Sequence, residues 1–209
     1  MQSIAWFLFA FLCGSLPFSF WIGRLFLHAD VRQFGDANPG ATNVLRAGGR
    51  ATAVLALLLD FVKGAVPVWL AYRWAGVDSV ALTLVALAPV LGHAFSPFLG
   101  FQGGKAVAVT GGIWCGLTIW EGPTVGGLLL GLAKIFLAVD GWVVLVAVAG
   151  MVLYCVLAPP EWNGLGLRAN PAVLFAVGIG NLLILAWKHR ADLARPFAFR
   201  PWLTQRRSR

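Results

Sequence analysis

"AVLALLLDFVKGAVPVWLAYRWA", residues 53–75, indicates that the chain is a helical membrane protein. It is almost continuously apolar, and it exceeds the ~20 residues that a helix needs to cross ~30 Å of hydrocarbon. It nevertheless contains Asp60 and Lys63, and charges inside a span are costly and usually face a cavity or a partner. Because the two are three residues apart, they share a helix face and can pair. The pair therefore either serves a polar site or forms a structural ion pair.

The rest of the chain has the same character. Of its 209 residues, 59% are hydrophobic and 11% are charged, and the mean hydropathy is +0.81, whereas soluble domains carry about 25% charged residues. The length allows one membrane domain over residues 1–209 and little beyond it. The N-terminus is apolar without a preceding basic region, which predicts a first membrane helix rather than a cleaved signal peptide.

Seven apolar segments predict an all-α membrane protein with seven transmembrane helices. They are Ile4–Phe26, Ala53–Ala75, Ser79–Phe95, Ala106–Trp120, Thr124–Val139, Trp142–Ala158 and Pro171–Trp187. The fifth and sixth are too long together for one span, and Asp140-Gly141 is the predicted turn between them. Gly112-x-x-x-Gly116 and Gly127-x-x-x-Gly131 predict close helix packing.

Basic residues orient these segments. With the N-terminus outside, the inner segments hold thirteen Lys and Arg residues and the outer segments hold two, Arg73 and Arg168. The thirteen are Arg24, Arg32, Arg46, Arg50, Lys105, Lys134 and the seven Lys and Arg residues from Lys188 onward. This asymmetry predicts a cytoplasmic C-terminus. The net charge of +8 is therefore explained first by topology, and second by anionic lipid or a phosphorylated substrate, rather than by nucleic acid.

The polar stretch "GDANPGATNVLRAGG", residues 35–49, is predicted to lie on the cytoplasmic side. Its glycines permit positive φ and a nest of backbone N–H groups that binds anions. Amides and a hydroxyl add neutral donors, and Arg46 is a bidentate cation suited to phosphate. The candidate binding residues here are Gly35, Asp36, Asn38, Gly40, Ala41, Thr42 and Asn43. The alternative is a flexible loop.

Two further segments add polar groups at the same membrane face. In "GSLPFSFWIGR", residues 14–24, Ser15 places a hydroxyl at membrane depth and Pro17 predicts a kink; the alternative is a Ser15 bonded to the carbonyl four residues earlier. In "GHAFSPFLGFQGGKAVAVTGG", residues 92–112, His93 ends one span and Lys105 opens the next.

Gly103 and Gly104 precede that lysine, as in phosphate-binding helix starts. The segment is not a Walker A loop, since Leu99 and Ala106 stand where that motif needs Gly and Ser or Thr. "WKHRADLAR", residues 187–195, closes the last span with His189 and Asp192 among basic residues. Segments distant in the sequence thus bring cations and glycines to one face, which predicts a ligand with phosphate and a lipid portion.

These motifs resemble those of the bacterial acyl-phosphate:glycerol-3-phosphate acyltransferases (PlsY type), in order and over nearly the whole chain. The resemblance implies a seven-helix inner-membrane enzyme with its site on the cytoplasmic side. It implies acyl transfer from acyl phosphate to the 1-hydroxyl of glycerol 3-phosphate, giving lysophosphatidic acid, without a metal or other cofactor. Three residues depart from the family pattern: Ala37 and Ala106 replace glycines, and Asp192 replaces a common Asn. An acid at position 192 would repel phosphate unless it pairs with Arg190 or Arg195.

The mechanism predicted is direct attack of the substrate hydroxyl on the acyl-phosphate carbonyl. None of the three histidines has an Asp five positions later, so the H-x4-D arrangement of many glycerolipid acyltransferases is missing. Positioning and charge stabilisation then supply catalysis, with the substrate phosphate or His93 as proton acceptor. The predicted catalytic residues are Ser15, Arg46, His93 and Lys105, with Lys63, Gly103, Gly104, His189 and Asp192 in substrate binding.

Two other classes of protein remain as alternatives. A transporter of a phosphorylated solute would also place cations in a membrane cavity, although transporters often show inverted repeats and broken midplane helices. A non-catalytic scaffold would leave the ordered Asn, Thr and Arg residues unexplained.

Overall fold

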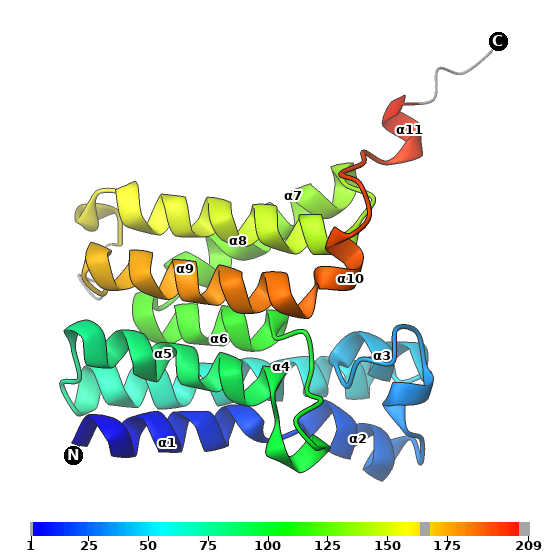
Figure 1. Cartoon of the computed structure of the whole chain (residues 1–209), viewed down its shortest axis with the longest axis horizontal. Coiled ribbons are helices and arrows are strands. Elements are labelled where there is room, and N and C mark those ends of the chain that lie inside the picture. The colour runs from blue at the N-terminus through cyan, green and yellow to red at the C-terminus, as the bar shows by residue number, and fades with distance from the viewer. Residues whose placement is uncertain (1, 164–167, 205–209) are drawn as a thin grey trace.

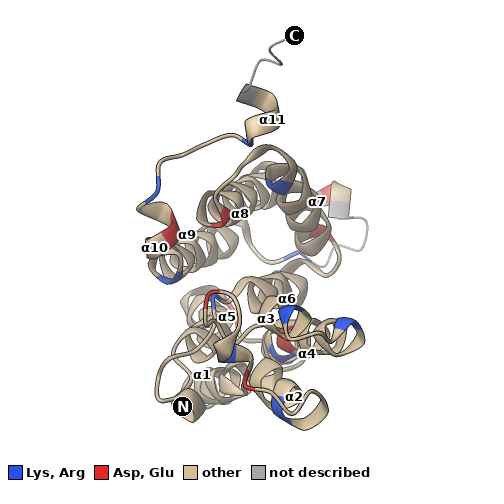
Figure 2. Cartoon of the chain, turned by 90° about the vertical axis from the view of Figure 1, so that its right-hand side faces the viewer, with Lys and Arg blue, Asp and Glu red and all other residues tan. Residues whose placement is uncertain are grey.

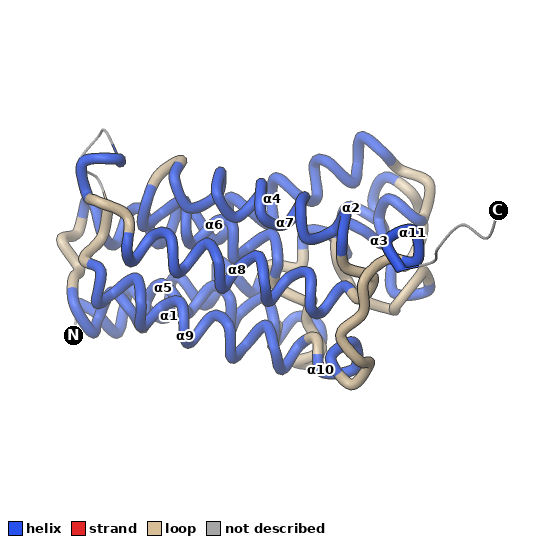
Figure 3. The backbone as a smooth tube through the Cα atoms, turned by 90° about the horizontal axis from the view of Figure 1, so that it is seen from above, coloured by secondary structure: helices blue, strands red, loops and turns tan. Residues whose placement is uncertain are grey.

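The computed structural model describes residues 2–163 and 168–204, and over these it is helical. The long helices run side by side, with their connections gathered at the two ends (Figures 1 and 3). Leu137 and Phe199 form an isolated bridge, and the described residues contain no strand. The prediction of an all-α chain is confirmed. The last three arginines of the basic tail lie outside the described residues.

The helices follow the apolar segments closely. The long ones are α1 (Gln2–Ser15), α4 (Arg50–Trp69), α5 (Ser79–Ala94), α6 (Val107–Thr118), α7 (Glu121–Phe136), α8 (Asp140–Leu157) and α9 (Pro171–Lys188), and the short ones are α2 (Phe18–Phe26), α3 (Ala41–Arg46), α10 (Arg190–Leu193) and α11 (Pro201–Thr204). A π-helical turn, η2 (Leu70–Trp74), extends α4, and the single turns are η1 (Val31–Gln33), η3 (Pro97–Leu99) and η4 (Pro160–Asn163).

Among the described residues, five helical segments are long and apolar enough to cross a membrane. They are Gln2–Phe26, Arg50–Trp74, Ser79–Leu99, Asp140–Leu157 and Pro171–Lys188. The two other predicted spans form shorter helices. α6 has 12 residues and α7 has 16, which at 1.5 Å per residue gives about 18 and 24 Å. The number seven therefore stays a prediction.

Pro17 breaks the first span into α1 and α2, as its position predicts. A proline has no N–H and cannot continue the helical ladder, so carbonyl groups near the break need other donors. The Ser96 hydroxyl donates to the carbonyl of Ser15 at 2.6 Å, and Lys63 Nζ donates to the carbonyl of Leu16 at 2.6 Å. Side chains from two other helical segments thus stabilise a broken helix at membrane depth.

Glycines set the closest helix contacts. A Cβ on Gly112 would lie 2.0 Å from the Phe61 carbonyl oxygen, and one on Gly116 would lie 2.8 Å from the Val68 Cβ. This confirms that the first glycine pair packs closely, against α4. A Cβ on Gly127 or Gly131 would meet nothing within 4 Å. The predicted packing of that second pair is wrong within this chain, because α7 turns them toward open space.

The turn between α7 and α8 lies at residues 137–139, so the prediction of a turn at Asp140-Gly141 is wrong. Asp140 instead opens α8, where a carboxylate complements the positive end of the helix dipole. The chain after α10 runs back over this turn, with Ala138 N–H bonded to the Ala198 carbonyl at 3.0 Å and Arg200 N–H bonded to the Phe136 carbonyl at 2.8 Å.

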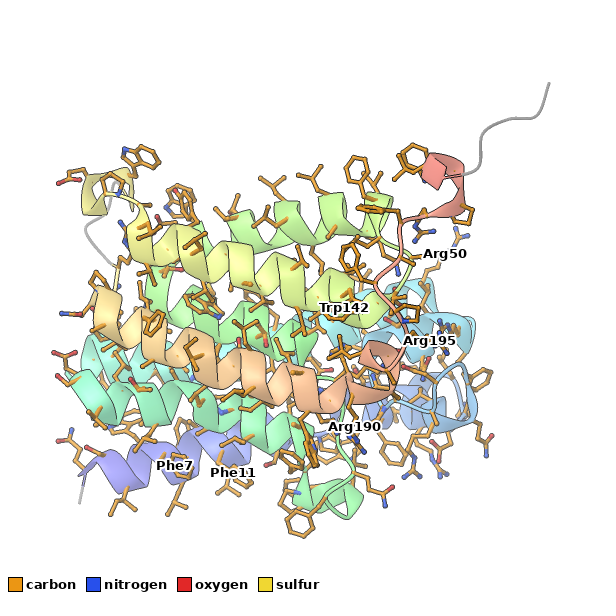
Figure 4. The ribbon with its side chains drawn as sticks, turned by 45° about the horizontal axis from the view of Figure 1, so that its top comes forward. Phe7, Phe11, Arg50, Trp142, Arg190 and Arg195 are labelled. Carbon is orange, nitrogen blue, oxygen red and sulfur yellow. The ribbon has the colours of Figure 1, made fainter. Side chains whose placement is uncertain are left out.

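The two ends of the bundle differ in charge. Phe7 and Phe11 lie along α1, while Arg50, Arg190 and Arg195 gather at the end opposite the N-terminus (Figure 4). We call this end, which carries α2, α3, α10 and the loop before α6, the polar end. Figure 2 looks onto it and shows Lys and Arg segments on α2, α3 and α10.

Candidate functional site

The loop that begins at Gly35 is fixed by its own side chains. The Asn43 amide donates to Asp36 Oδ1 at 3.0 Å and to the Asn38 carbonyl at 2.8 Å, and Arg46 Nη1 donates to Asn43 Oδ1 at 3.1 Å. Gly35 has φ +59°, and a Cβ on it would lie 1.9 Å from Arg46 Nη1. The loop is therefore an ordered cradle around Arg46 rather than a flexible linker.

The short helix α3 follows directly in this loop. Gly40 precedes it with an extended backbone, and the Gly40 N–H bonds the Asn38 carbonyl at 2.8 Å. Ala41 and Thr42 form its first turn, where N–H groups have no acceptor within the helix. Thr42 is exposed and Ala41 is half-buried. These residues thus lie beside the cradle at the polar end.

Lys105 joins this loop to the other end of the sequence. Its Nζ lies 2.9 Å from Asp36 Oδ2 and 2.9 Å from Asp192 Oδ2. Arg46 Nη1 lies 4.0 Å from the other oxygen of Asp36. Three segments that are far apart in the sequence, the Gly35 loop, the start of α6 and α10, therefore converge on one ion-pair cluster.

Asp192 pairs with Lys105, whereas Arg190 and Arg195 were the two partners considered from the sequence. α10 packs onto α8, where a Cβ on Gly141 would lie 2.9 Å from the Asp192 Cβ. The Asp192 carboxylate meets Lys105 just before α6. Arg190 instead donates to the Trp187 carbonyl at 3.0 Å and stacks over that indole.

Partial burial disfavours the charged form of the Asp36 carboxylate, but the Lys105 ammonium, Asn38 N–H and Asn43 amide outweigh it and hold its pKa below the usual value. Burial acts against the charged form of Lys105 as well, yet its two carboxylate partners raise its pKa. Asp36 and Lys105 therefore each favour the ionised form of the other. The cluster brings two carboxyl groups and two basic side chains together close to solvent.

Gly103 and Gly104 press against His93. The Gly104 N–H bonds the His93 carbonyl at 3.0 Å, and a Cβ on Gly104 would lie 2.2 Å from His93 Nε2. His93 is 8% exposed, and its Nδ1 lies 3.9 Å from Asp60 Oδ1. The imidazole thus lies beneath the glycine loop that carries Lys105, one layer inside the cluster.

Lys188 is a residue that sequence reasoning did not place in the site. Its Nζ donates to the carbonyls of Ala94 and Gly103, both at 2.9 Å, and so ties α9 to the glycine loop. The only signal in the sequence was its position as the first basic residue after the last apolar run. His189 follows it, buried, with Nδ1 2.9 Å from the Leu185 carbonyl. Burial lowers the pKa of His189, which favours its neutral form.

Lys63 and Ser15 lie away from the cluster. Lys63 Nζ is 2.6 Å from Asp60 Oδ1, and Ser19 donates to Asp60 Oδ2 at 2.6 Å. The Ser15 hydroxyl donates to the Phe11 carbonyl at 2.7 Å. Lys63 is 5% exposed and Ser15 is 1% exposed. The structure thus favours the alternatives stated for both residues: a structural ion pair, and a serine bonded to the carbonyl four residues earlier.

Two surface hollows, of about 260 and 320 Å³, lie at the end of the bundle away from the cluster. They are lined by residues such as Asp78, Asn170, Trp6 and Trp74, and contain none of the predicted site residues. Across residues 2–163 and 168–204, no group of three or more His, Cys, Asp or Glu gathers to hold a metal ion.

Comparison with known proteins identifies a family to which the chain is similar. A family model described as glycerol-3-phosphate acyltransferase matches residues 4–198. The glycerol-3-phosphate acyltransferase of Erythrobacter litoralis is 39% identical over 195 residues, covering 90% of this chain and 88% of the relative. That of Ralstonia pickettii is 38% identical over 192 residues, covering 90% and 87%.

A solved structure shares the fold. The crystal structure of PlsY (YgiH), an integral membrane glycerol 3-phosphate acyltransferase, in its glycerol 3-phosphate form, matches with a TM-score of 0.78 and 29% identity, covering 98% of this chain and 93% of that chain. The family model, the two relatives and the matching fold lead to one conclusion. This chain belongs to the glycerol-3-phosphate acyltransferase family.

Proposed function

We propose that this chain transfers a fatty acyl group from acyl phosphate to the 1-hydroxyl of glycerol 3-phosphate. The products are lysophosphatidic acid and inorganic phosphate, and the reaction is the first step of phospholipid biosynthesis. Acyl transfer to glycerol 3-phosphate is the activity of the family to which the chain belongs. The observation that carries the proposal is the convergence of Arg46 and Lys105 on Asp36, because a reaction between two phosphate-bearing substrates needs several cations at one place.

Arg46 and Lys105 neutralise the substrate phosphates in this proposal. Asn38, Asn43 and the backbone of residues 35–42 add neutral donors. The planar guanidinium of Arg46 suits two phosphate oxygens at once, and Asn43 holds it in place from a buried position. The acyl chain lies among the apolar helices, and the phosphates stay at the polar end.

The chemical step is a direct acyl transfer. The 1-hydroxyl oxygen of glycerol 3-phosphate attacks the acyl carbonyl carbon, the bond from that carbon to the phosphate oxygen breaks, and inorganic phosphate leaves with the electron pair and the proton of the hydroxyl. His93 is the rival proton acceptor. Its Nε2 is covered by Gly104 and its Nδ1 faces Asp60, so the loop would have to move before the imidazole could reach a substrate. This favours the substrate phosphate.

We further propose that the chain crosses a bacterial inner membrane seven times, with the N-terminus outside and the polar end facing the cytoplasm. The thirteen basic residues assigned to the inner side support this orientation. So does the path of the chain, because α1 begins at one end of the bundle and α10 and α11 lie at the other (Figure 1). A fluorescent protein fused to the C-terminus should fluoresce in a bacterial host, and an alkaline phosphatase fused there should be inactive. The opposite pattern would reverse the proposed orientation.

The activity is tested with the purified full chain in detergent, given labelled glycerol 3-phosphate and palmitoyl phosphate. Label should move to the lipid phase, and palmitoyl coenzyme A should not replace the donor. Transfer from the coenzyme A ester alone would refute the proposed donor. In sealed vesicles, label that accumulates as water-soluble glycerol 3-phosphate would indicate a transporter.

The residue assignments are tested by Arg46→Ala and Lys105→Ala, with Arg50→Ala as the matched control. Arg50 is an exposed arginine at the same end, at the start of α4. Removing one donor to a charged transition state typically lowers the rate by roughly 10²–10³, and both site variants should approach that loss. The control should stay within about twofold of the unchanged chain. Equal activity in all three variants would refute the assignment.

A further inference from the structure

The Lys105 ammonium is shared between two carboxylates that come from different parts of the fold. Asp36 belongs to the cradle and also accepts hydrogen bonds from the Asn43 amide and the Asn38 N–H. Asp192 reaches the same ammonium from α10, at 2.9 Å. One positive charge thus faces two negative charges, and Arg46 is a further 4.0 Å contact of Asp36 only.

The two carboxylates are not equivalent. Asp36 is held by three other groups of its own loop, so it stays in place when Lys105 moves. Asp192 lies on a helix of four residues, and its charge is directed at Lys105. Its side chain is 21% exposed and that of Lys105 is 27% exposed, so both are within reach of a water-soluble anion.

A phosphate that arrives at Lys105 meets this second carboxylate at contact distance. Like charges at such a distance repel each other, and the repulsion is only partly screened in a half-buried site. The phosphate must therefore displace the Asp192 carboxylate from the ammonium. Asp192 then turns toward solvent, where it is rehydrated.

We propose that Asp192 sets the affinity for glycerol 3-phosphate by competing with the substrate phosphate for Lys105. This makes it a positioning residue that acts through the lysine. The inference rests on the proposed binding of a substrate phosphate at Lys105. It reverses the assignment of Asp192 as a group that binds the substrate directly.

The test is the variant Asp192→Asn, which removes the negative charge and keeps the shape of the side chain. The dissociation constant for glycerol 3-phosphate is measured by calorimetry on the purified full chain without an acyl donor, and KM and kcat are measured with palmitoyl phosphate. The dissociation constant and the KM for glycerol 3-phosphate should fall about two- to fivefold, the value of one partly exposed ion pair. The KM for palmitoyl phosphate and kcat should change less than about twofold. A residue that only supports the fold would instead alter all of these parameters together.

Asp140→Asn is the matched control, because Asp140 also pairs with a lysine at the polar end, Lys134, outside the cluster. It should leave the dissociation constant unchanged. If Asp192→Asn unfolds the protein, Asp192→Ser removes the same charge with a smaller group.

An unchanged or increased dissociation constant in Asp192→Asn would overturn the competition, whatever the donor turns out to be. If the unsubstituted chain transfers no acyl group from palmitoyl phosphate but Asp192→Asn still binds glycerol 3-phosphate more tightly, only the proposed donor is refuted.

Discussion

Gly35→Ala tests whether the position of Arg46 limits the reaction. A Cβ on Gly35 would lie 1.9 Å from Arg46 Nη1 and 2.5 Å from Asn43 Oδ1, whereas ordinary contacts begin at 3.4 Å. The guanidinium must therefore retreat by about 1.5 Å, and a misplacement of about 1 Å at an active site can lower the rate 10²-fold. The left-handed backbone adds about 1–2 kcal/mol of strain to an alanine.

Gly48→Ala separates these two effects. Gly48 lies in the same polar stretch with φ +105°, and a Cβ on it would meet nothing within 4 Å. An alanine there has a strained backbone without the collision. We expect both variants to lose stability, and only Gly35→Ala to lose activity, by about 100-fold in kcat/KM. That loss corresponds to about 2.7 kcal/mol of transition-state stabilisation.

The assay follows phosphate release from palmitoyl phosphate at varied glycerol 3-phosphate. Stability is measured by thermal unfolding with a thiol-reactive dye, because Cys155 is buried and Cys13 and Cys115 are partly buried. A loss of about 1 kcal/mol lowers Tm by roughly 2–4 °C in a chain of this size. If Gly35→Ala is as active as Gly48→Ala, the position of Arg46 does not limit the reaction.

Three further outcomes follow from the same geometry. Ala37→Gly should raise the free energy of unfolding by about 0.5–1 kcal/mol, because Ala37 is exposed and its φ of +59° is strained for an alanine. Ala106→Gly should be nearly neutral, since the strain relieved at φ +64° is offset by the loss of a buried methyl group worth ~0.8 kcal/mol. A larger gain in Tm at Ala106 than at Ala37 in the dye assay would contradict this comparison. Lys63→Met should destabilise the fold by about 3–5 kcal/mol because it leaves the buried Asp60 carboxyl group without its lysine partner, and adding Asp60→Asn should recover part of that loss. Equal Tm values for the single and double variants would refute the ion pair. His93→Gln should reduce kcat by less than about tenfold if the substrate phosphate accepts the proton, and a loss of 10²–10⁴ would identify His93 as the base.

The apolar segments predicted most of the fold because membrane insertion depends on local hydropathy. Pro17 ended α1 as its missing N–H requires, and Gly112 and Gly116 packed against α4. The turn at residues 137–139 was missed. Its position depends on the return of the chain at Ala198 and Arg200, which no local pattern indicates.

The cradle residues were also predicted, because Gly35, Asn38, Asn43 and Arg46 are unusual in so apolar a chain. The different roles of Lys63 and Lys105 could not be predicted from the sequence, since both are single lysines near glycines.

Hydropathy and backbone freedom are properties of short stretches, so a helical membrane protein with glycine-rich, cationic segments at one face could be predicted from local patterns. Which charges meet depends instead on how the helices pack. Packing turns Lys63 inward to Asp60 and places Lys105 between Asp36 and Asp192. An ion pair depends on the distance between helices that are far apart in the chain, and the Coulomb energy of each lysine is fixed only when those helices have packed.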